Sequence, residues 1–478
     1  MQTHDYDLVV LGAGSGGYAA ARVANELGAK VALVDHGPLG GLCILRGCMP
    51  SKAFIASSDA LHDVRESPAL GIQIEGTIAA DMQAVALRKR ALVKEFADHR
   101  IEGINTFPVH LGHAQFVSDE AVMVGEDMRL QARSFIIATG SSVAPVRIPG
   151  LSEAGYIDSD GVLELERIPG SVAVLGGGYT ACELGQFLAR MGAKTTVLIR
   201  SNHLLTDADD DVGEALTGYF REDGINVVTY ATVARVEKRG QRKVVHYAVG
   251  GERLELAVEE IFFAMGRVPN VEGLGLAAAG VEYDLEDGIG VDLTLRTNRP
   301  NIFAIGDVMD EFQLVHVAIY QGEIAARNAV SGTNEEADYR IFGAHAIFTD
   351  PQIAHVGMTE KDLKRAGIEY LFGRYDFAEH GKAMCLNKTR GFVKMMARPK
   401  TGEILGASVI GPQGSELIHE VIVAMNYRAT VGDFMRIPHL HPTLAEIWTY
   451  PAEECAAQCG LKEAVDQMVE MATSGGAD

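Results

Sequence analysis

A glycine-rich unit that occurs twice at matched spacing restricts the fold of this chain more than any other feature. Gly12 opens the first copy and Gly176 the second, and in each copy another glycine follows 16 positions later, at Gly28 and Gly192. Both copies predict a strand, a tight turn, a helix and a second strand, which is the unit that binds a dinucleotide. Because an internal repeat is stronger evidence than either copy alone, two bound dinucleotides are expected.

The glycines of the first copy have separate tasks in such a unit. Gly12 makes the tight turn, Gly14 lets the backbone approach a pyrophosphate, and Gly17 lets the helix pack closely on the strand. Asp35 ends the second apolar strand, where a carboxylate accepts hydrogen bonds from a ribose diol. An incidental glycine turn, the alternative, does not explain an acid at this position.

The second copy, which carries Gly176, Gly178 and Ala181, differs from the first where the ribose is read. The position that holds an acid in the first copy holds Ile199 in the second, and Arg200 follows it. Loss of the carboxylate removes both the diol acceptor and the repulsion toward a 2′-phosphate, and arginine pairs well with phosphate. The sequence therefore favours NADP(H) over NAD(H) at this site, with a solvated surface arginine as the alternative.

Cys43 and Cys48 lie five positions apart just after the first unit. Arg46 and Lys52 are cationic neighbours, and Pro50 suits the first turn of a helix, whose positive end favours thiolate over thiol. Since disulfide exchange needs a thiol of low pKa, we interpret the pair as a redox disulfide. Two packed, reduced cysteines are one alternative. A metal site is the other, although no second cysteine pair follows at the spacing that zinc ligands usually show.

Three later segments place small or polar residues after apolar strands. Residues 139–140 follow the strand predicted over 135–138, residues 266–267 lie in a turn that closes the second unit, and Asp307 ends an apolar strand. Open parallel sheets bind ligands at such strand ends. From about residue 346 onward, strand patterns alternate with a helix near 416–427, which indicates an α+β domain.

The C-terminal part contains His441 with Glu446 about a helical turn away. Imidazole is the natural acid/base for thiol chemistry near neutral pH, and a carboxylate can fix its tautomer and raise its basicity. A histidine that is merely satisfied near a proline turn is the alternative. His439 and His441 form a His-x-His pair, which could indicate a metal site, but no third ligand is evident nearby in the sequence. Cys455 and Cys459, at helical i, i+4 spacing, are interpreted as packed, with an electron relay or a soft-metal site as the alternatives.

Charge and composition exclude several classes of partner. The net charge is −22 and the pI is about 5.1, so the chain repels phosphate backbones and anionic lipid surfaces, and we expect neither nucleic acid nor membrane as partner. The first seven residues carry acids where a signal peptide needs a basic region, which favours a cytoplasmic location. Six cysteines in 478 residues do not indicate a disulfide-stapled scaffold.

Together, the two glycine-rich units, the Cys-x4-Cys pair, Gly306-Asp307 and the late His-Pro-Thr with glutamate resemble the class I pyridine nucleotide-disulfide oxidoreductases over about residues 5–450. Segments 391–394, 404–407 and 415–418 are most similar to dihydrolipoamide dehydrogenase. The resemblance implies an α/β fold class, with two Rossmann-like domains for FAD and NAD(P) and a C-terminal α+β dimerisation domain. The first part of the FAD domain, the NAD(P) domain, the central continuation of the FAD domain and the dimerisation domain are expected at residues 1–150, 151–272, 273–345 and 346–478.

The resemblance also implies a role for each matching residue. The residues with expected catalytic roles are Cys43, Cys48, His441, Glu446, Lys52 and Glu183. Cys48 is expected next to the flavin and Cys43 at the substrate, while His441, held by Glu446, reaches the disulfide from the partner subunit of an obligate homodimer.

The cofactors occupy the two repeated units in this family, and Lys52 and Glu183 are expected to form an ion pair beside the flavin ring. The residues expected to bind FAD are Gly12, Gly14, Gly17, Asp35, Lys52, Thr139, Gly140, Asp307, His316 and Ala318. Those expected to bind NAD(P) are Gly176, Gly178, Ala181, Arg200, Gly266 and Arg267.

The activity implied is two-electron transfer between NAD(P) and a lipoyl dithiol, on a protein or in a small molecule, without a metal. Two departures favour an alternative. The usual Thr-Cys-x-Asn-Val-Gly-Cys pattern is altered at Leu42, Leu45 and Arg46, and Ile199-Arg200 is similar to the glutathione and mercuric reductases. The alternative is an NADPH-dependent reductase of another disulfide, a metal ion or a quinone. A third interpretation is a flavin-bearing binding protein whose disulfide no longer turns over.

Overall fold

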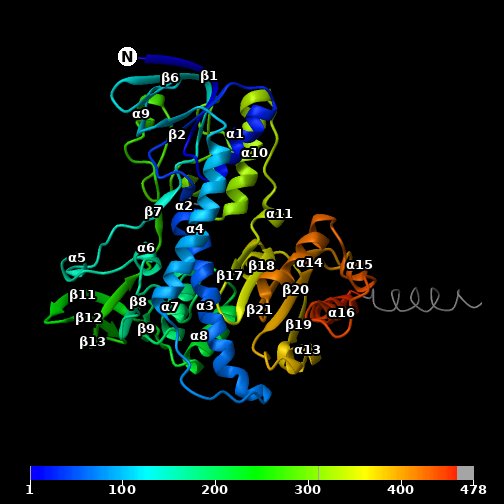
Figure 1. The fold of residues 1–478 in the computed structure, drawn as a ribbon. Helices are drawn as coiled ribbons and strands as arrows, with labels where there is room; N and C mark the ends of the chain where they lie inside the picture. Colours follow the sequence, from blue (N-terminus) through cyan, green and yellow to red (C-terminus); the bar gives the residue numbers. More distant parts are fainter. Residues whose placement is uncertain (1, 310–311, 460–478) are drawn as a thin grey trace, which may run out of the picture.

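The computed structural model describes residues 2–309 and 312–459. These residues form separate lobes, and each lobe contains a β-sheet of its own (Figure 1). The first nucleotide-binding domain lies at the top of the view, the second at the lower left and the C-terminal domain at the lower right. Two long helices, α3 (Cys48–Glu66) and α4 (Met82–Ile104), run from the first domain down between the other two. The sequence predicts a largely helical stretch over 53–110, and these two helices account for most of it.

The first domain is built on a seven-stranded sheet of order β3-β2-β1-β6-β5-β4, with β16 paired to the second half of β6. The pairs of β1 with β2 and of β6 with β1 and β16 are parallel, so the carboxyl ends of these strands meet at one edge. The bounds of its elements are β1 Gln2–Leu11, α1 Ser15–Glu26, β2 Val31–Asp35, α2 Gly41–Arg46, η1 Ser67–Leu70, β3 Val109–Leu111, β4 Ala114–Ser118, β5 Ala121–Val124, β6 Met128–Ile137, β7 Ser141–Val143, β16 Ile302–Ala304, η2 Gly306–Met309, α10 Val315–Ser331 and α11 Tyr339–Phe342.

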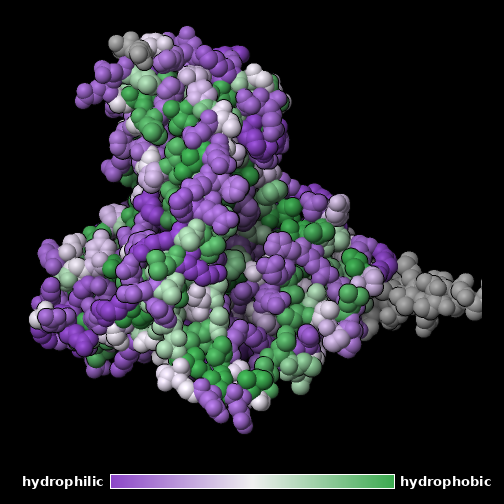
Figure 2. Space-filling view, in the orientation of Figure 1, coloured by the Kyte–Doolittle hydropathy of each residue, from purple (hydrophilic) through white to green (hydrophobic). Residues whose placement is uncertain are grey.

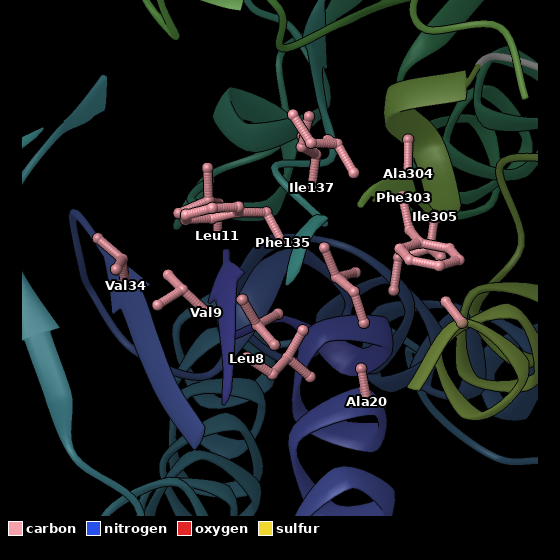
Figure 3. Close-up of a cluster of buried hydrophobic side chains, with 14 of the residues drawn as sticks. Leu8, Val9, Leu11, Ala20, Val34, Phe135, Ile137, Phe303, Ala304 and Ile305 are labelled. Atoms are coloured by element: carbon pink, nitrogen blue, oxygen red, sulfur yellow. The ribbon is translucent and has the colours of Figure 1, made fainter. Parts of the chain in front are cut away.

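Apolar strands form the core of this sheet. Leu8, Val9 and Val10 of β1 have no exposed surface, and α1 and α10 pack against this strand. Figure 3 shows side chains of β1 gathered with Phe135 and Phe303 from the neighbouring strands. Burial of such side chains stabilises the fold by about 1.5 to 3 kcal/mol each.

The second nucleotide-binding domain repeats the plan on a smaller scale. Its parallel sheet has the order β10-β9-β8-β14, and an antiparallel sheet β11-β12-β13 stands beside it. The bounds are α5 Leu151–Ala154, α6 Ser159–Leu163, β8 Ser171–Leu175, α7 Tyr179–Arg190, β9 Lys194–Leu198, α8 Asp210–Glu222, β10 Asn226–Val228, β11 Thr232–Arg239, β12 Arg242–Val249, β13 Glu252–Val258, β14 Glu260–Phe263 and β15 Arg267–Pro269. The next helix, α9 Leu276–Ala279, packs on β4 of the first domain (Figure 1).

The C-terminal domain packs helices on a five-stranded antiparallel sheet of order β17-β18-β21-β20-β19. Trp448 has no exposed surface and donates its indole N–H to the Leu417 carbonyl of α14 at 3.0 Å. The bounds are β17 His345–Ile347, β18 Gln352–Gly357, α12 Glu360–Ala366, β19 Leu371–Asp376, η3 Phe377–Glu379, α13 Gly381–Cys385, β20 Phe392–Ala397, β21 Ile404–Gly411, α14 Gly414–Asn426, α15 Val431–Met435, η4 Ala445–Trp448 and α16 Thr449–Gln458.

A fully buried lysine joins the second and C-terminal domains. Lys394 of β20 places its Nζ 2.8 Å from Asp209, 2.7 Å from Asp211 and 3.4 Å from Glu360. Three carboxylates around one ammonium offset the cost of burying its charge, which would otherwise be several kcal/mol. The contact fixes the second domain against the sheet of the third.

The observed sheets confirm the expected fold class of two nucleotide-binding α/β domains and a C-terminal α+β domain. Polar and apolar residues are interspersed over the visible face of all the lobes (Figure 2). Within the described ranges, no helix has both the length and the apolar character needed to cross a membrane.

Candidate redox site

Cys43 and Cys48 are brought together by two adjoining helices. Cys43 lies in α2, and Cys48 is the first residue of α3. Gly47 separates the helices, and a Cβ there would lie 3.0 Å from the Leu42 carbonyl oxygen and 3.2 Å from the Cys43 Cα. The chain therefore folds back tightly on itself at Gly47, and both cysteines are present as free, partly buried thiols.

The two thiols affect each other more strongly than any other group does. A hydrogen bond from the Cys43 thiol lowers the pKa of Cys48 to about 7, assisted by the charge of Lys52 and against the effect of burial. The same hydrogen bond, together with burial, raises the pKa of Cys43 above its usual value. Negative charge therefore resides on Cys48 near neutral pH, and Cys43 keeps its proton until a base removes it.

An ion pair stands beside Cys48. Lys52, one turn along α3, donates from Nζ to Glu183 Oε2 of α7 at 2.8 Å, and Glu183 is nearly buried. The other carboxylate oxygen accepts from the Phe348 backbone N–H at 3.0 Å, and Lys52 Nζ lies 4.4 Å from the centre of the Phe348 ring. The pair thus joins all the domains at one point and holds a cation close to the thiolate.

His441 and Glu446 form a second polar pair in the C-terminal domain. The imidazole Nδ1 lies 3.0 Å from Glu446 Oε2; the histidine side chain is 79% exposed and the glutamate only 12%. Across the described residues, His441 makes no hydrogen bond or ion pair with either cysteine. The pair therefore projects outward from its own chain, fixed from behind by a nearly buried carboxylate.

The first glycine-rich turn has the properties of a pyrophosphate site. Helix α1 begins after Gly14 without a capping side chain, so its first N–H groups are free to bind an anion. Gly12 has φ +106°, and a Cβ there would lie 2.2 Å from the Ala138 carbonyl oxygen. A Cβ on Gly17 would lie 1.9 Å from the Gly12 carbonyl oxygen, so helix and strand touch without side chains between them.

The carboxylate of Asp35 is fixed at the edge of the same turn. It accepts hydrogen bonds from the backbone N–H groups of Ala13 at 2.8 Å and Gly37 at 2.6 Å. Gly41, at φ +79°, passes so close to Gly14 that a Cβ on it would lie 2.7 Å from the Gly14 Cα. An uncapped helix start, a glycine-lined approach and a fixed acid together fit the adenosine diphosphate part of FAD.

Asp307 lies in a network that joins two separate parts of the chain. Its Oδ2 accepts from the Ser141 hydroxyl at 2.7 Å, and Arg267 donates to the Ser141 hydroxyl at 2.8 Å and to its carbonyl at 2.6 Å. Thr139 donates its hydroxyl to the Asn270 carbonyl at 2.8 Å. Arg267, which is expected to bind the nicotinamide nucleotide, thus lies in the same hydrogen-bond network as Asp307, which is expected to bind FAD. Ser141 connects the two residues, and the small polar turn over 139–141 is the sequence signal that marks it.

The start of α10 approaches the first site from another side. Leu314 at its N-terminus provides no capping side chain, so the first N–H groups of α10 are available to a ligand. Ala318 packs closely, since a Cβ on Gly306 would lie 3.2 Å from the Ala318 Cβ. His316 is exposed, and its Nε2 lies 3.0 Å from the Phe342 carbonyl oxygen. Gly140, at φ +71°, leaves open space where a side chain would stand.

The second glycine-rich turn has the same design. Gly176 has φ +125°, and a Cβ there would lie 2.2 Å from the Ala264 carbonyl oxygen, whereas a Cβ on Gly178 would meet nothing within 4 Å. Helix α7 begins after Gly178 without a capping side chain, and Ala181 is buried in its first turn. Gly266 also leaves open space. The exposed Arg200 follows β9, and in the part of the chain that the structure describes no hydrogen bond or ion pair engages its guanidinium.

Comparison with known families agrees with this geometry. The family model described as pyridine nucleotide-disulphide oxidoreductase matches residues 6–322, and the model of the dimerisation domain of that family matches residues 344–452. The chain belongs to the pyridine nucleotide-disulphide oxidoreductase family. The resemblance seen in the sequence motifs is thereby confirmed.

Family members of several activities are similar to the chain. A dihydrolipoyl dehydrogenase of Geobacillus stearothermophilus is 36% identical over 94% of this chain and 95% of its own length. A mercuric reductase of Bacillus cereus is 34% identical over 93% of this chain and 70% of its own length. Among solved structures, the HOCl-induced flavoprotein disulfide reductase RclA from Escherichia coli superposes with a TM-score of 0.82 at 26% identity, covering 92% of this chain and 98% of that one. The chain is thus a flavoprotein disulfide oxidoreductase, an enzyme of an FAD-dependent family that uses pyridine nucleotides.

Proposed function

We propose that this oxidoreductase passes two electrons between a lipoyl dithiol and NAD(P) through a disulfide that forms between Cys43 and Cys48. The observation that carries the proposal is the unequal thiol pair: Cys48 has its pKa lowered to about 7 beside Lys52, and Cys43 has its pKa raised. In such a pair the two sulfurs have different roles in disulfide exchange, because Cys48 holds the negative charge while Cys43 forms the bond to the substrate sulfur.

Bound FAD supplies two-electron exchange between a nicotinamide and the disulfide. At the disulfide, His441 removes the proton from a substrate thiol, and the resulting thiolate attacks the sulfur of Cys43. The bond between Cys43 and Cys48 breaks, and Cys48 leaves as a thiolate held by Lys52. The second substrate thiolate then attacks the substrate sulfur bound to Cys43, which closes the substrate disulfide, and Cys43 takes up a proton from His441. Two electrons and one proton remain on the protein thiols, and the other substrate proton passes to solvent.

A homodimer is the second part of the proposal, and the match to the dimerisation domain supports it. The exposed apolar side chains of this domain include Val423, Tyr427, Ile437 and Leu440. Leu440 directly precedes His441, so a surface that buries these side chains against a second copy also carries His441 to that copy. The acid/base of each site would then come from the partner chain.

NADP(H) is the proposed nucleotide, because Ile199 stands where the first unit has Asp35, and the guanidinium of the next residue, Arg200, has no hydrogen bond or ion pair among the described residues. Replacement of Arg200 by alanine is expected to raise the KM for NADPH about tenfold or more, since a charged hydrogen bond contributes roughly 1.5 to 3 kcal/mol, and to leave the KM for NADH nearly unchanged. Steady-state kinetics with both nucleotides measures the effect. Arg253→Ala, at an exposed arginine of β13, is the matched control. An equal effect of Arg200→Ala on both nucleotides would contradict the assignment.

A reductase of another disulfide, a metal ion or a quinone is the second candidate. The free Arg200 favours it, because dihydrolipoamide dehydrogenases normally carry an acid at the position of Ile199. The similar mercuric reductase is named for such an activity. Arg46, which replaces an apolar residue of the usual motif, lies 3.4 Å from Asp160 and is more than half exposed beside the cysteines. Either substrate class would use the same pair of thiols.

A panel of substrates separates the candidates. Oxidation of dihydrolipoamide is measured with NAD and with NADP, and oxidation of NADPH is measured with glutathione disulfide, Hg(II) and a quinone. We expect dihydrolipoamide to give the highest kcat/KM, with NADP preferred. Absence of dihydrolipoamide turnover with either nucleotide, together with turnover of one of the other acceptors, would replace the first proposal by the second.

A further inference from the structure

A buried histidine lies behind the acid/base pair. His380 stands between η3 and α13, and its side chain has no exposed surface. Its Nε2 lies 3.5 Å from Oε1 of Glu446, and the other oxygen of Glu446, Oε2, lies 3.0 Å from Nδ1 of His441. One carboxylate therefore stands between two imidazoles, of which one is buried and the other is 79% exposed.

The surroundings of His380 leave the carboxylate as its natural partner. Neither ring nitrogen has a well-aligned hydrogen bond in the described chain. The rings of Phe377 and Tyr450 meet the imidazole edge-on, each with a centroid separation of 6.3 Å. A buried polar group without a partner is destabilising. The ring N–H of the buried His380 is therefore best explained by donation to the Glu446 carboxylate that it faces.

The charged and titratable groups around His380 come from several elements. Glu446 of η4 and His441 of the preceding loop face it, and Tyr450 of α16 packs against its ring. Tyr375 of β19 stacks on Tyr450, with 3.9 Å between the ring centroids. Burial lowers the pKa of His380; the charge of Glu446 opposes this effect and the charge of His441 adds to it. His380 is thus neutral at physiological pH, and with its proton on Nε2 it points a donor at Glu446.

We propose that His380 is a positioning residue of the acid/base pair, which holds the second oxygen of Glu446 and withdraws part of the carboxylate charge from His441. This inference rests on the proposed function, because it gives His441 the role of acid/base. A carboxylate that accepts from two imidazoles stabilises the protonated form of each one less than it would stabilise a single partner. His380 therefore leaves less of the carboxylate charge to His441 than Glu446 alone would offer.

The test follows the titration of His441 directly. The FAD-bound dimer is labelled at the histidine Cε1 carbons, and the His441 signal is assigned by its loss in His441→Gln. In His380→Phe the midpoint of the His441 titration is expected to move up by about half a pH unit or more. In His380→Gln, which keeps a neutral N–H donor, it is expected to stay at the wild-type pH. His99→Gln, an exposed histidine of α4, is the matched control.

Two results would overturn the proposal. An unchanged midpoint in His380→Phe means that His380 only packs, and a downward shift means that it does not withdraw charge. Should the phenylalanine variant fail to fold, the ¹⁵N shifts of His380 in the wild type decide the matter, since an Nδ1–H tautomer contradicts donation to Glu446. None of these readouts needs turnover. Inactivity toward every disulfide would therefore refute the proposed function without changing what the titration shows about His380.

Discussion

Replacing Cys48 by serine will lower disulfide turnover by at least about 1000-fold, because without this sulfur the disulfide with Cys43 cannot form and only the background reaction remains. Serine is nearly isosteric, but its hydroxyl cannot hold the charge that the Cys43 hydrogen bond and Lys52 direct to this position. Nor can it form a disulfide. Stopped-flow reduction of the flavin by NADPH is expected to remain within a few-fold of wild type, since in this reverse direction the nicotinamide reacts before the thiols do.

The control for this variant is Cys385→Ser, which changes an exposed thiol at the end of α13 and is expected to retain full turnover. Cys43→Ser is expected to be as inactive as Cys48→Ser, because neither sulfur can form the disulfide alone. Retention of substantial dihydrolipoamide or glutathione disulfide turnover in either variant would contradict the proposed route of the electrons.

Replacing His441 by glutamine will lower the rate of thiol–disulfide exchange by about 100-fold to 10000-fold, the range that loss of a general acid/base produces. The reason lies in the raised pKa of Cys43, whose proton does not leave near neutral pH without a base. Glutamine preserves the volume and a donor toward Glu446 but accepts no proton. Rapid-mixing measurement of the reduced enzyme with a disulfide reports the step, and flavin reduction by NADPH is the internal control.

Complementation between subunits tests where His441 acts. When the Cys48→Ser and His441→Gln chains are mixed into heterodimers, one site of each heterodimer combines an intact thiol pair with an intact histidine if the histidine comes from the partner. We expect heterodimers to regain about half of the wild-type activity. If both functions belonged to the same chain, every site would lack one of them and the heterodimers would stay inactive.

The frame of the molecule was readable from local sequence because local physical demands produce it. Gly12 and Gly176 must be glycine, since a Cβ on either would lie 2.2 Å from the carbonyl oxygen of the residue that follows the neighbouring strand. The buried parts of β1 and β8, residues 8–11 and 172–175, appear as continuous apolar runs, because parallel strands are covered on both faces. Even the helical pattern after Cys48 follows from sequence.

Contacts between distant segments could not be read in the same way. The bonds of Arg267 to Ser141, and of Ser141 to Asp307, join residues more than 100 positions apart. Lys394 reads as one more polar residue in an apolar strand, and its burial among three carboxylates depends on how two domains pack. His380 likewise stands next to a short turn with no motif around it. No local sequence pattern predicts these tertiary contacts.

The most direct test of the account is the pH dependence of the thiolate–flavin charge-transfer absorption after anaerobic two-electron reduction of the FAD-bound enzyme. A group whose pKa is about 7 becomes a thiolate as pH rises, so the long-wavelength band is expected to grow through about pH 7 in the wild type and to be absent at every pH in Cys48→Ser. Cys43→Ser, which keeps a hydroxyl donor toward Cys48, is expected to retain the band. A band that survives in Cys48→Ser and disappears in Cys43→Ser would place the charge on the wrong sulfur, and the electron route proposed here would be wrong.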